Sequence, residues 1–145
     1  MGKIIVPDAS VILKWAFDNP DENHRDKSVM LLETWLTGEI EIILPKLWCF
    51  EVGNVLMLKT PELAPKFMKL FLDYNFTESE MTVELSDITL GIMKNHRVTF
   101  YDAAYHATAL LNNGLLVTAD ESYYNKTRAI GNISALSNWE ESLKE

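Results

Sequence analysis

The 145 residues are enough for one domain with a buried core, and 48% of them are apolar and 23% charged, the balance of an ordinary globular protein. The formal net charge of −8 argues against a protein that coats nucleic acid, because neutralising phosphates requires a basic surface. No stretch is long and apolar enough for a membrane span, the amino terminus resembles a core strand rather than a signal peptide, and Cys49 is the single cysteine. We therefore expect one cytoplasmic domain over residues 1–145, with no membrane association.

The first half of the chain alternates strand and helix patterns. Lys3 to Val6 is short and β-branched and predicts a buried strand, which Pro7 ends and Asp8 follows. A helix is predicted over Ser10 to Phe17, a second over Glu22 to Leu36, a strand over Glu39 to Leu44, and a very apolar helix over Leu47 to Lys59. Asp8 thus lies at the carboxyl end of the first strand, where open α/β sheets place their ligand sites.

The second half continues the alternation after the break at Thr60-Pro61. Helices are predicted over Glu62 to Tyr74, Val83 to Asn95, Thr99 to Leu111 and Glu121 to Arg128, strands over Leu115 to Thr118 and within Ile130 to Leu136, and a short exposed strand within Phe76 to Thr82. Strands that alternate with helices indicate a three-layer α/β/α sandwich around a mostly parallel sheet.

Three aspartates have simple structural explanations. Asp8 and Asp120 each follow a strand and precede a helix, so either side chain could cap a helix N-terminus. Asp102 stands three residues after Thr99, which resembles a capping box. For each aspartate by itself, capping and a functional role remain open.

Glu51 has no comparable explanation. It is the only acidic residue between Glu41 and Glu62 and lies within an apolar helix, so any exposed stripe around it would be mostly apolar. A buried carboxylate must be paired, protonated or bound to a cation. We therefore favour a functional role for Glu51.

Together these carboxylates point to a metal site. Four acidic groups brought to one place repel one another unless a cation offsets their charge. Oxygen ligands without a cluster of Cys or His indicate Mg²⁺ or Mn²⁺, and such ions activate water for attack on a phosphodiester.

Four segments, in this order, resemble the PIN-domain family and most of all its VapC-type toxin ribonucleases. They are Val6-Pro7-Asp8-Ala9-Ser10, Phe50-Glu51-Val52-Gly53-Asn54-Val55-Leu56, Tyr101-Asp102-Ala103-Ala104-Tyr105 and Leu116-Val117-Thr118-Ala119-Asp120. Each motif is weak by itself, but the ordered set covers nearly the whole chain.

The resemblance implies an α/β/α sandwich and an endoribonuclease that depends on Mg²⁺ or Mn²⁺, with Asp8, Glu51, Asp102 and Asp120 as catalytic and metal-binding residues. It implies supporting roles for the hydroxyls of Ser10 and Thr118, and we expect Asn54, in the second motif, to support the site as well. It also implies an RNA substrate, a small antitoxin partner and a homodimer. The resulting hypothesis is that the aspartates hold one or two ions while Glu51 orients the water that attacks the phosphate.

Other residues have weaker claims. Lys14, Lys46, Lys126 and Arg128 are candidate RNA phosphate contacts, with solvated surface charge as the alternative for each. His106 lies one turn after Asp102 but has no second His or Cys nearby, so we expect a structural or substrate-edge role for it. His24 and His96 are expected to be solvated.

Three alternatives to a toxin nuclease remain. One is a catalytically silent PIN-like module whose acidic groove binds Arg or Lys of a partner protein. Another is an RNA-processing nuclease outside toxin systems. A phosphate-accepting receiver domain ranks low, because the acidic pair after the first strand and the late Lys that it requires are not evident.

Overall fold

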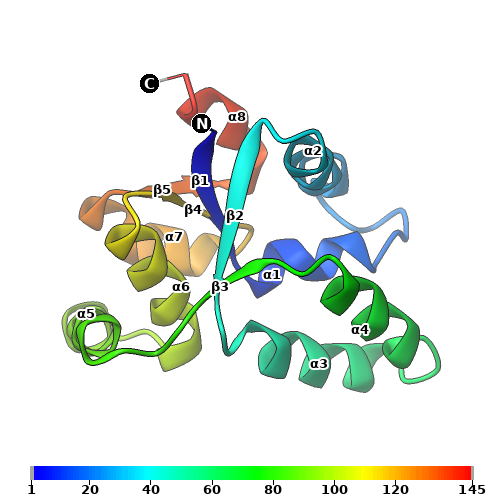
Figure 1. Ribbon diagram of the computed structural model, residues 1–145, viewed down its shortest axis with the longest axis horizontal. Helices are drawn as coiled ribbons and strands as arrows, with labels where there is room; N and C mark the ends of the chain where they lie inside the picture. The colour runs from blue at the N-terminus through cyan, green and yellow to red at the C-terminus, as the bar shows by residue number, and fades with distance from the viewer. Residues whose placement is uncertain (1, 145) are drawn as a thin grey trace.

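The computed structural model describes residues 2–144, and these contain one five-stranded sheet in which every pairing is parallel. The strands are β1 (Lys3–Pro7), β2 (Ile40–Pro45), β3 (Thr77–Ser79), β4 (Leu115–Thr118) and β5 (Ile133–Ala135), in the spatial order β3-β2-β1-β4-β5. Ile5 of β1 pairs with Ile42 on one side and with Leu115 on the other. Because the strands are parallel, all their carboxyl ends lie at the same edge of the sheet (Figure 1).

Helices cover both faces of this sheet, which confirms the predicted three-layer α/β/α fold (Figure 1). The α-helices are α1 (Ala9–Ile12), α2 (Arg25–Leu36), α3 (Trp48–Lys59), α4 (Ala64–Asp73), α5 (Val83–His96), α6 (Phe100–Leu111), α7 (Glu121–Thr127) and α8 (Trp139–Ser142), and the 3₁₀ turns are η1 (Leu13–Trp15), η2 (Arg128–Ile130) and η3 (Leu136–Asn138). Helices α5, α6 and α7 lie on one side, and α1 to α4 lie on the other.

The core is centred on β1, β4 and α6. Residues 103–109 of α6 are all buried, because this helix packs on the sheet with one side and on α5 with another. A smaller apolar cluster of Leu85, Ile92, Ala103 and Ala107 joins α5 to α6. The helix that carries Asp102 is therefore held rigidly against the middle of the sheet.

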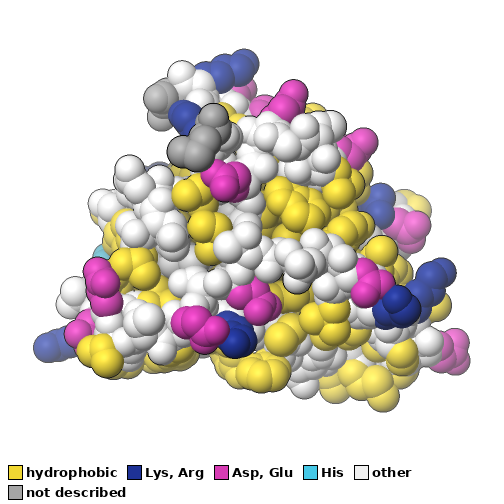
Figure 2. Space-filling view, viewed as in Figure 1, with side chains coloured by type: hydrophobic (Ala, Val, Ile, Leu, Met, Phe, Trp, Pro, Cys, Tyr) yellow, Lys and Arg dark blue, Asp and Glu magenta, His cyan; other side chains and the backbone are white. Residues whose placement is uncertain are grey.

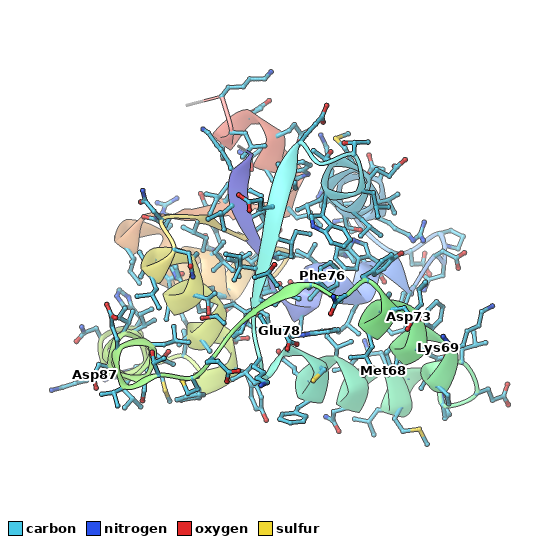
Figure 3. The ribbon with its side chains drawn as sticks, viewed as in Figure 1. Met68, Lys69, Asp73, Phe76, Glu78 and Asp87 are labelled. Carbon is cyan, nitrogen blue, oxygen red and sulfur yellow. The ribbon has the colours of Figure 1, made fainter. Side chains whose placement is uncertain are left out.

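An aromatic cluster fixes the start of α3 on the other side. The ring of Phe76 lies 5.9 Å from Trp15, 4.7 Å from Trp35 and 5.9 Å from Trp48, measured between centroids. The Trp48 indole also donates a 2.7 Å hydrogen bond to Glu78 Oε2, and both Phe76 and Glu78 can be followed in Figure 3. These contacts anchor the first turn of α3, which carries Glu51.

Two predicted helices differ from the structure. The segment over residues 10–17 forms the four-residue α1 and then tightens into η1, where the Arg25 side chain donates hydrogen bonds to the carbonyl groups of Lys14 and Trp15. The next helix begins at Arg25 rather than Glu22, because His24 has a left-handed backbone with φ of 58°. The strands within 76–82 and 130–136 are confirmed as the two edge strands β3 and β5.

Within residues 2–144, no helix combines the length and the apolar character that crossing a bilayer requires.

Candidate acidic active site

Asp8 is the most deeply buried of the four predicted carboxylates, with 6% of its surface exposed. Its side chain caps α1, where Oδ1 accepts hydrogen bonds from the Val11 amide at 3.3 Å and from the Ser10 hydroxyl. Burial raises the pKa of Asp8 to about 7, although the hydroxyls of Ser10 and Thr118 partly offset this effect. Of the two roles left open for Asp8, the structure shows the helix cap, and this cap leaves a carboxyl group that is hard to ionise.

The predicted supporting hydroxyls connect the ends of β1 and β4. Ser10 Oγ donates to Asp8 and accepts a 2.9 Å hydrogen bond from the Ala119 amide, so it bridges the two strand ends. Thr118 Oγ1 accepts a 3.0 Å hydrogen bond from the Asp120 amide. Ser10 and Thr118 therefore hold the backbone on which both aspartates sit.

Asp120 caps α7 and is exposed. Its Oδ1 accepts a 3.0 Å hydrogen bond from the Tyr123 amide, so the capping alternative holds here too. Oδ1 makes the cap, and the residue also lies in the wall of a cavity that contains Asp102.

Asp102 lies in the first turn of α6. Thr99 is the N-cap, and its hydroxyl accepts a 3.2 Å hydrogen bond from the Asp102 amide. Burial of this half-buried carboxyl, followed by the nearby negative charge of Asp120, raises the pKa of Asp102. The Lys126 ammonium opposes that rise.

Glu51 points inward, as its apolar surroundings predict. Within the part of the chain that the structure describes, Glu51 Oε1 and the Tyr105 hydroxyl are both buried without a hydrogen-bond partner. Burial and, after it, the charge of Asp102 raise the pKa of Glu51. The neighbouring Tyr105 hydroxyl has a smaller, opposite effect on this pKa. Burial and the charge of Glu51 in turn raise the pKa of Tyr105 well above its usual value. A buried carboxylate oxygen with no donor is costly, so this position suits a bound cation or a proton.

The electrostatics show that the four carboxylates occupy one locality. Asp102 raises the pKa of Asp8 and of Glu51, and Asp120 raises the pKa of Asp102. Asp102 therefore interacts with each of the other three. Such mutual repulsion falls when a cation binds, because the cation favours the ionised form of every group.

The side chains do not form a closed cage. Among residues 2–144, no three Asp, Glu, His or Cys side chains lie close enough together to hold one metal ion. The donor set nevertheless fits a hard divalent cation, since it consists of carboxylate oxygens and includes the unpartnered Oε1 of Glu51.

Two basic residues border the acidic groups. A cavity of about 330 Å³ has Asp102 and Asp120 in its wall together with Arg97 and Lys126. The sequence predicts Lys126 as a phosphate contact but does not single out Arg97. Arg97 ends α5 in a left-handed conformation with φ of 55°, and only its place shortly before Thr99 and Asp102 could have pointed to it.

The remaining predicted contacts are less well placed. Lys14 is paired with Glu22 at 2.5 Å and Lys46 with Glu80 at 2.8 Å, so both charges are already engaged. Arg128 and Asn54 are exposed, and their proposed roles stay predictions.

His106 is structural rather than a ligand, one of the two roles expected for it. Its Nε2 donates to the Gly131 carbonyl at 2.8 Å, which leaves Nδ1 to accept the Tyr123 hydroxyl at 2.9 Å. Burial lowers the pKa of His106. This chain of hydrogen bonds ties α6 to α7, and so ties the helix of Asp102 to the helix that Asp120 caps. His24 is exposed, as expected, and the partly exposed His96 ring forms a 3.0 Å hydrogen bond with the Lys126 carbonyl.

The fold is shared with several solved structures. A toxin–antitoxin complex from Klebsiella pneumoniae matches with a TM-score of 0.66 and 15% identity, over 91% of this chain and 97% of that one. PAE2754 from Pyrobaculum aerophilum matches with a TM-score of 0.66 and 24% identity, over 99% and 98%. The sarcin–ricin-loop-cleaving toxin VapC20 from Mycobacterium tuberculosis matches with a TM-score of 0.65 and 13% identity, over 88% and 95%.

These likenesses, all below 25% identity, show the fold. No curated protein sequence matches the chain. The family model described as the PIN domain matches residues 5–129, a span that includes all four acidic residues of the pocket. This chain therefore belongs to the PIN domain family.

Proposed function

We propose that the protein is an endoribonuclease that depends on Mg²⁺ or Mn²⁺ and acts through Asp8, Glu51, Asp102 and Asp120. We propose further that it is the toxin half of a toxin–antitoxin pair. Membership of the PIN domain family supports the first statement. The second is supported by structural neighbours that are described as a toxin–antitoxin complex, as a VapBC2 complex from Rickettsia felis bound to promoter DNA, and as a toxin that cleaves the sarcin–ricin loop.

One observation carries the proposal: the charge of Asp102 interacts with each of the other three carboxyl groups, and burial raises the pKa of three of the four. Burial raises the pKa of Asp8 to about 7 and that of Glu51 as well. A protein gains nothing in stability from such crowding, because ionising the groups opposes folding. A bound divalent cation turns the same arrangement into a favourable one.

The residues of the site suit different catalytic roles. Asp8, Asp102 and Asp120 would hold the cation, with Glu51 orienting the attacking water; the bound cation would supply charge neutralisation at the scissile phosphate and activation of that water. Ser10 and Thr118 hold the Asp8 carboxylate through their hydroxyls. Lys126 and Arg97 offer positive charge for the phosphates beside the cut.

An exposed apolar surface supports a protein partner. On α3, Phe50 is 72% exposed and Leu58 is 75% exposed. Met57, Leu63, Leu70 and Leu72 add further exposed apolar area on α3, α4 and the turn between them, and Figure 2 shows apolar side chains gathered over these helices. An exposed apolar patch of this kind indicates an interaction surface, which suits the proposed antitoxin or a second copy of the chain.

The test is cleavage of a defined single-stranded RNA by the purified protein in buffer stripped of metal, with Mg²⁺ or Mn²⁺ added back. We expect cleavage that leaves 5′-phosphate and 3′-hydroxyl ends and that stops with EDTA. Asp8→Asn and Glu51→Gln should each lower the rate at least about 100-fold, the scale seen when a group that stabilises the transition state is removed. Asp87→Asn, an exposed change on α5 that Figure 3 locates, is the matched control and should cleave like the wild type.

The alternative functions predict different results. A silent binding module would cleave no RNA with either ion, and its acidic pocket would still bind an Arg-rich peptide. An RNA-processing nuclease would cleave but would form no complex with the product of a neighbouring antitoxin gene.

A further inference from the structure

A second cavity of about 330 Å³ also has Asp120 in its wall. Its lining comes from three parts of the chain that are distant in sequence. His24 precedes α2, Tyr124 and Asn125 lie on α7, and Ser137 lies in η3, while Leu136, which is 1% exposed, provides an apolar floor. The volume falls in the range of small-ligand pockets.

Four polar side chains of this cavity make no hydrogen bond to the rest of the described chain. Across residues 2–144, no hydrogen bond engages the His24 ring, the Tyr124 hydroxyl, the Asn125 amide or the Ser137 hydroxyl. Two of the four side chains are aromatic, and the other two carry both donors and acceptors. Aromatic faces beside unpaired polar edges are the features with which proteins recognise single bases of RNA.

We propose that this cavity is a subsite for one unpaired nucleobase of the RNA, adjacent to the phosphate at Asp120. This inference rests on the proposed nuclease function and deepens it by naming what sets the cleavage position. The base would lie between the Tyr124 and His24 side of the wall and the Leu136 floor, with its polar edge toward Asn125 and Ser137.

Charge separates the two cavities that share Asp120. In the first cavity, Arg97 and Lys126 lie beside Asp102 and Asp120 and supply positive charge for a phosphate. The cavity proposed for the base contains Asp120 and Glu121 and no Lys or Arg, so it disfavours a phosphate and accepts a neutral base. The strand would thus place its backbone on one side of Asp120 and its base on the other.

The acidic wall also predicts a preference among bases. The Glu121 carboxylate can only accept hydrogen bonds, so it matches the exocyclic amino group of adenine, cytosine or guanine. Uracil has no such amino group, and its one donor on that edge, the N3–H, lies between two carbonyl oxygens that a carboxylate repels. We therefore expect uridine to be the least favoured base at this position.

The first experiment sequences the cut ends from a randomised single-stranded RNA pool. The wild type should show a preference at one position next to the cut, with uridine disfavoured there. Tyr124→Ala should flatten this preference and lower kcat/KM about 5- to 150-fold, the range produced by losing one base–aromatic stack. Tyr124→Phe should keep the preference, and the control Asp87→Asn should change neither quantity.

Two exposed substitutions keep the test independent of folding. Glu121→Gln should raise the acceptance of uridine, and Asn125→Ala should weaken the preference, without loss of stability. Unchanged base preference in all of the Tyr124→Ala, Glu121→Gln and Asn125→Ala variants would overturn the proposal.

A binding measurement separates this inference from the nuclease proposal. Adenosine, cytidine and uridine are titrated into ¹⁵N-labelled protein and followed by amide chemical shifts. Saturable shifts at Tyr124, Asn125 and Ser137, weakest with uridine, would support the subsite even for a protein that cuts no RNA. Millimolar adenosine that leaves these three amides unmoved would refute it, even for an active nuclease.

Discussion

Replacing Asp8 by Asn should make the metal-free protein more stable at neutral pH. Burial raises the pKa of Asp8 from 3.8 to about 7. Between these values the unfolded chain loses the proton while the folded chain keeps it, so the free energy of unfolding falls as the pH rises. Asn stays neutral, and its oxygen can still accept the hydrogen bonds of Ser10 and Val11.

The size of this gain in stability follows from the raised pKa of Asp8. A difference of about 3 pKa units at about 1.4 kcal/mol each gives a ceiling of about 4 kcal/mol, and relaxation around the buried group should reduce the measured value to about 2–4 kcal/mol. This loss should develop between about pH 4 and about pH 7 and be complete above that range. Glu51 and Asp102 also have raised pKa values, so part of the pH dependence should remain in the variant.

Urea unfolding in EDTA, repeated across this pH range, measures the prediction. The wild type should lose stability relative to Asp8→Asn as the pH rises, and the two curves should converge near pH 4. The exposed Asp87→Asn variant should follow the wild type throughout. Parallel curves for the wild type and Asp8→Asn would refute the reasoning that burial of this carboxyl opposes folding.

Three further predictions concern ions, the core link and the apolar surface. Mn²⁺ at about 100 times its Kd should stabilise the wild type by about 2.7 kcal/mol, and Asp8→Asn by clearly less, as thermal melting at neutral pH would show. Tyr123→Phe leaves His106 Nδ1 without its hydrogen-bond donor, so the free energy of unfolding measured in urea should fall by about 1–3 kcal/mol. A variant as stable as the wild type would contradict the proposed link between α6 and α7. Changing Phe50 and Leu58 together to Ser should abolish self-association or antitoxin binding in sedimentation experiments. The melting temperature should stay nearly unchanged, because both side chains are exposed. Assembly that persists in this variant would place the interface elsewhere.

Much of the fold and the placement of the acidic residues could be predicted, because local signals were strong. The β-branched run before Asp8 and the apolar run before Asp120 each form a buried strand that ends at a helix cap. Thr99 caps α6 as its spacing from Asp102 predicts. In these cases hydrophobic pattern and capping chemistry agree, and the parallel topology then brings the strand ends to one edge.

Other features depend on contacts between distant residues. The helix expected over 10–17 ends early because Arg25 takes up the carbonyl groups of Lys14 and Trp15, and no local pattern reveals that contact. The sequence does not predict helix α8, which contains the buried Trp139. The Trp139 indole donates a hydrogen bond to the Lys27 carbonyl on α2, a contact between residues far apart in the chain. The burial of Tyr105 beside Glu51 and the cavity that joins His24 to α7 also arise only when the chain folds.

Anomalous diffraction from crystals grown with Mn²⁺ would show whether the acidic side chains share a metal ion. We expect a manganese peak within ligand distance, about 2.0–2.4 Å, of carboxylate oxygens from Asp8, Asp102 and Asp120, with Glu51 turned toward it. Crystals that contain Mn²⁺ at other surface carboxylates but none in this pocket would contradict it.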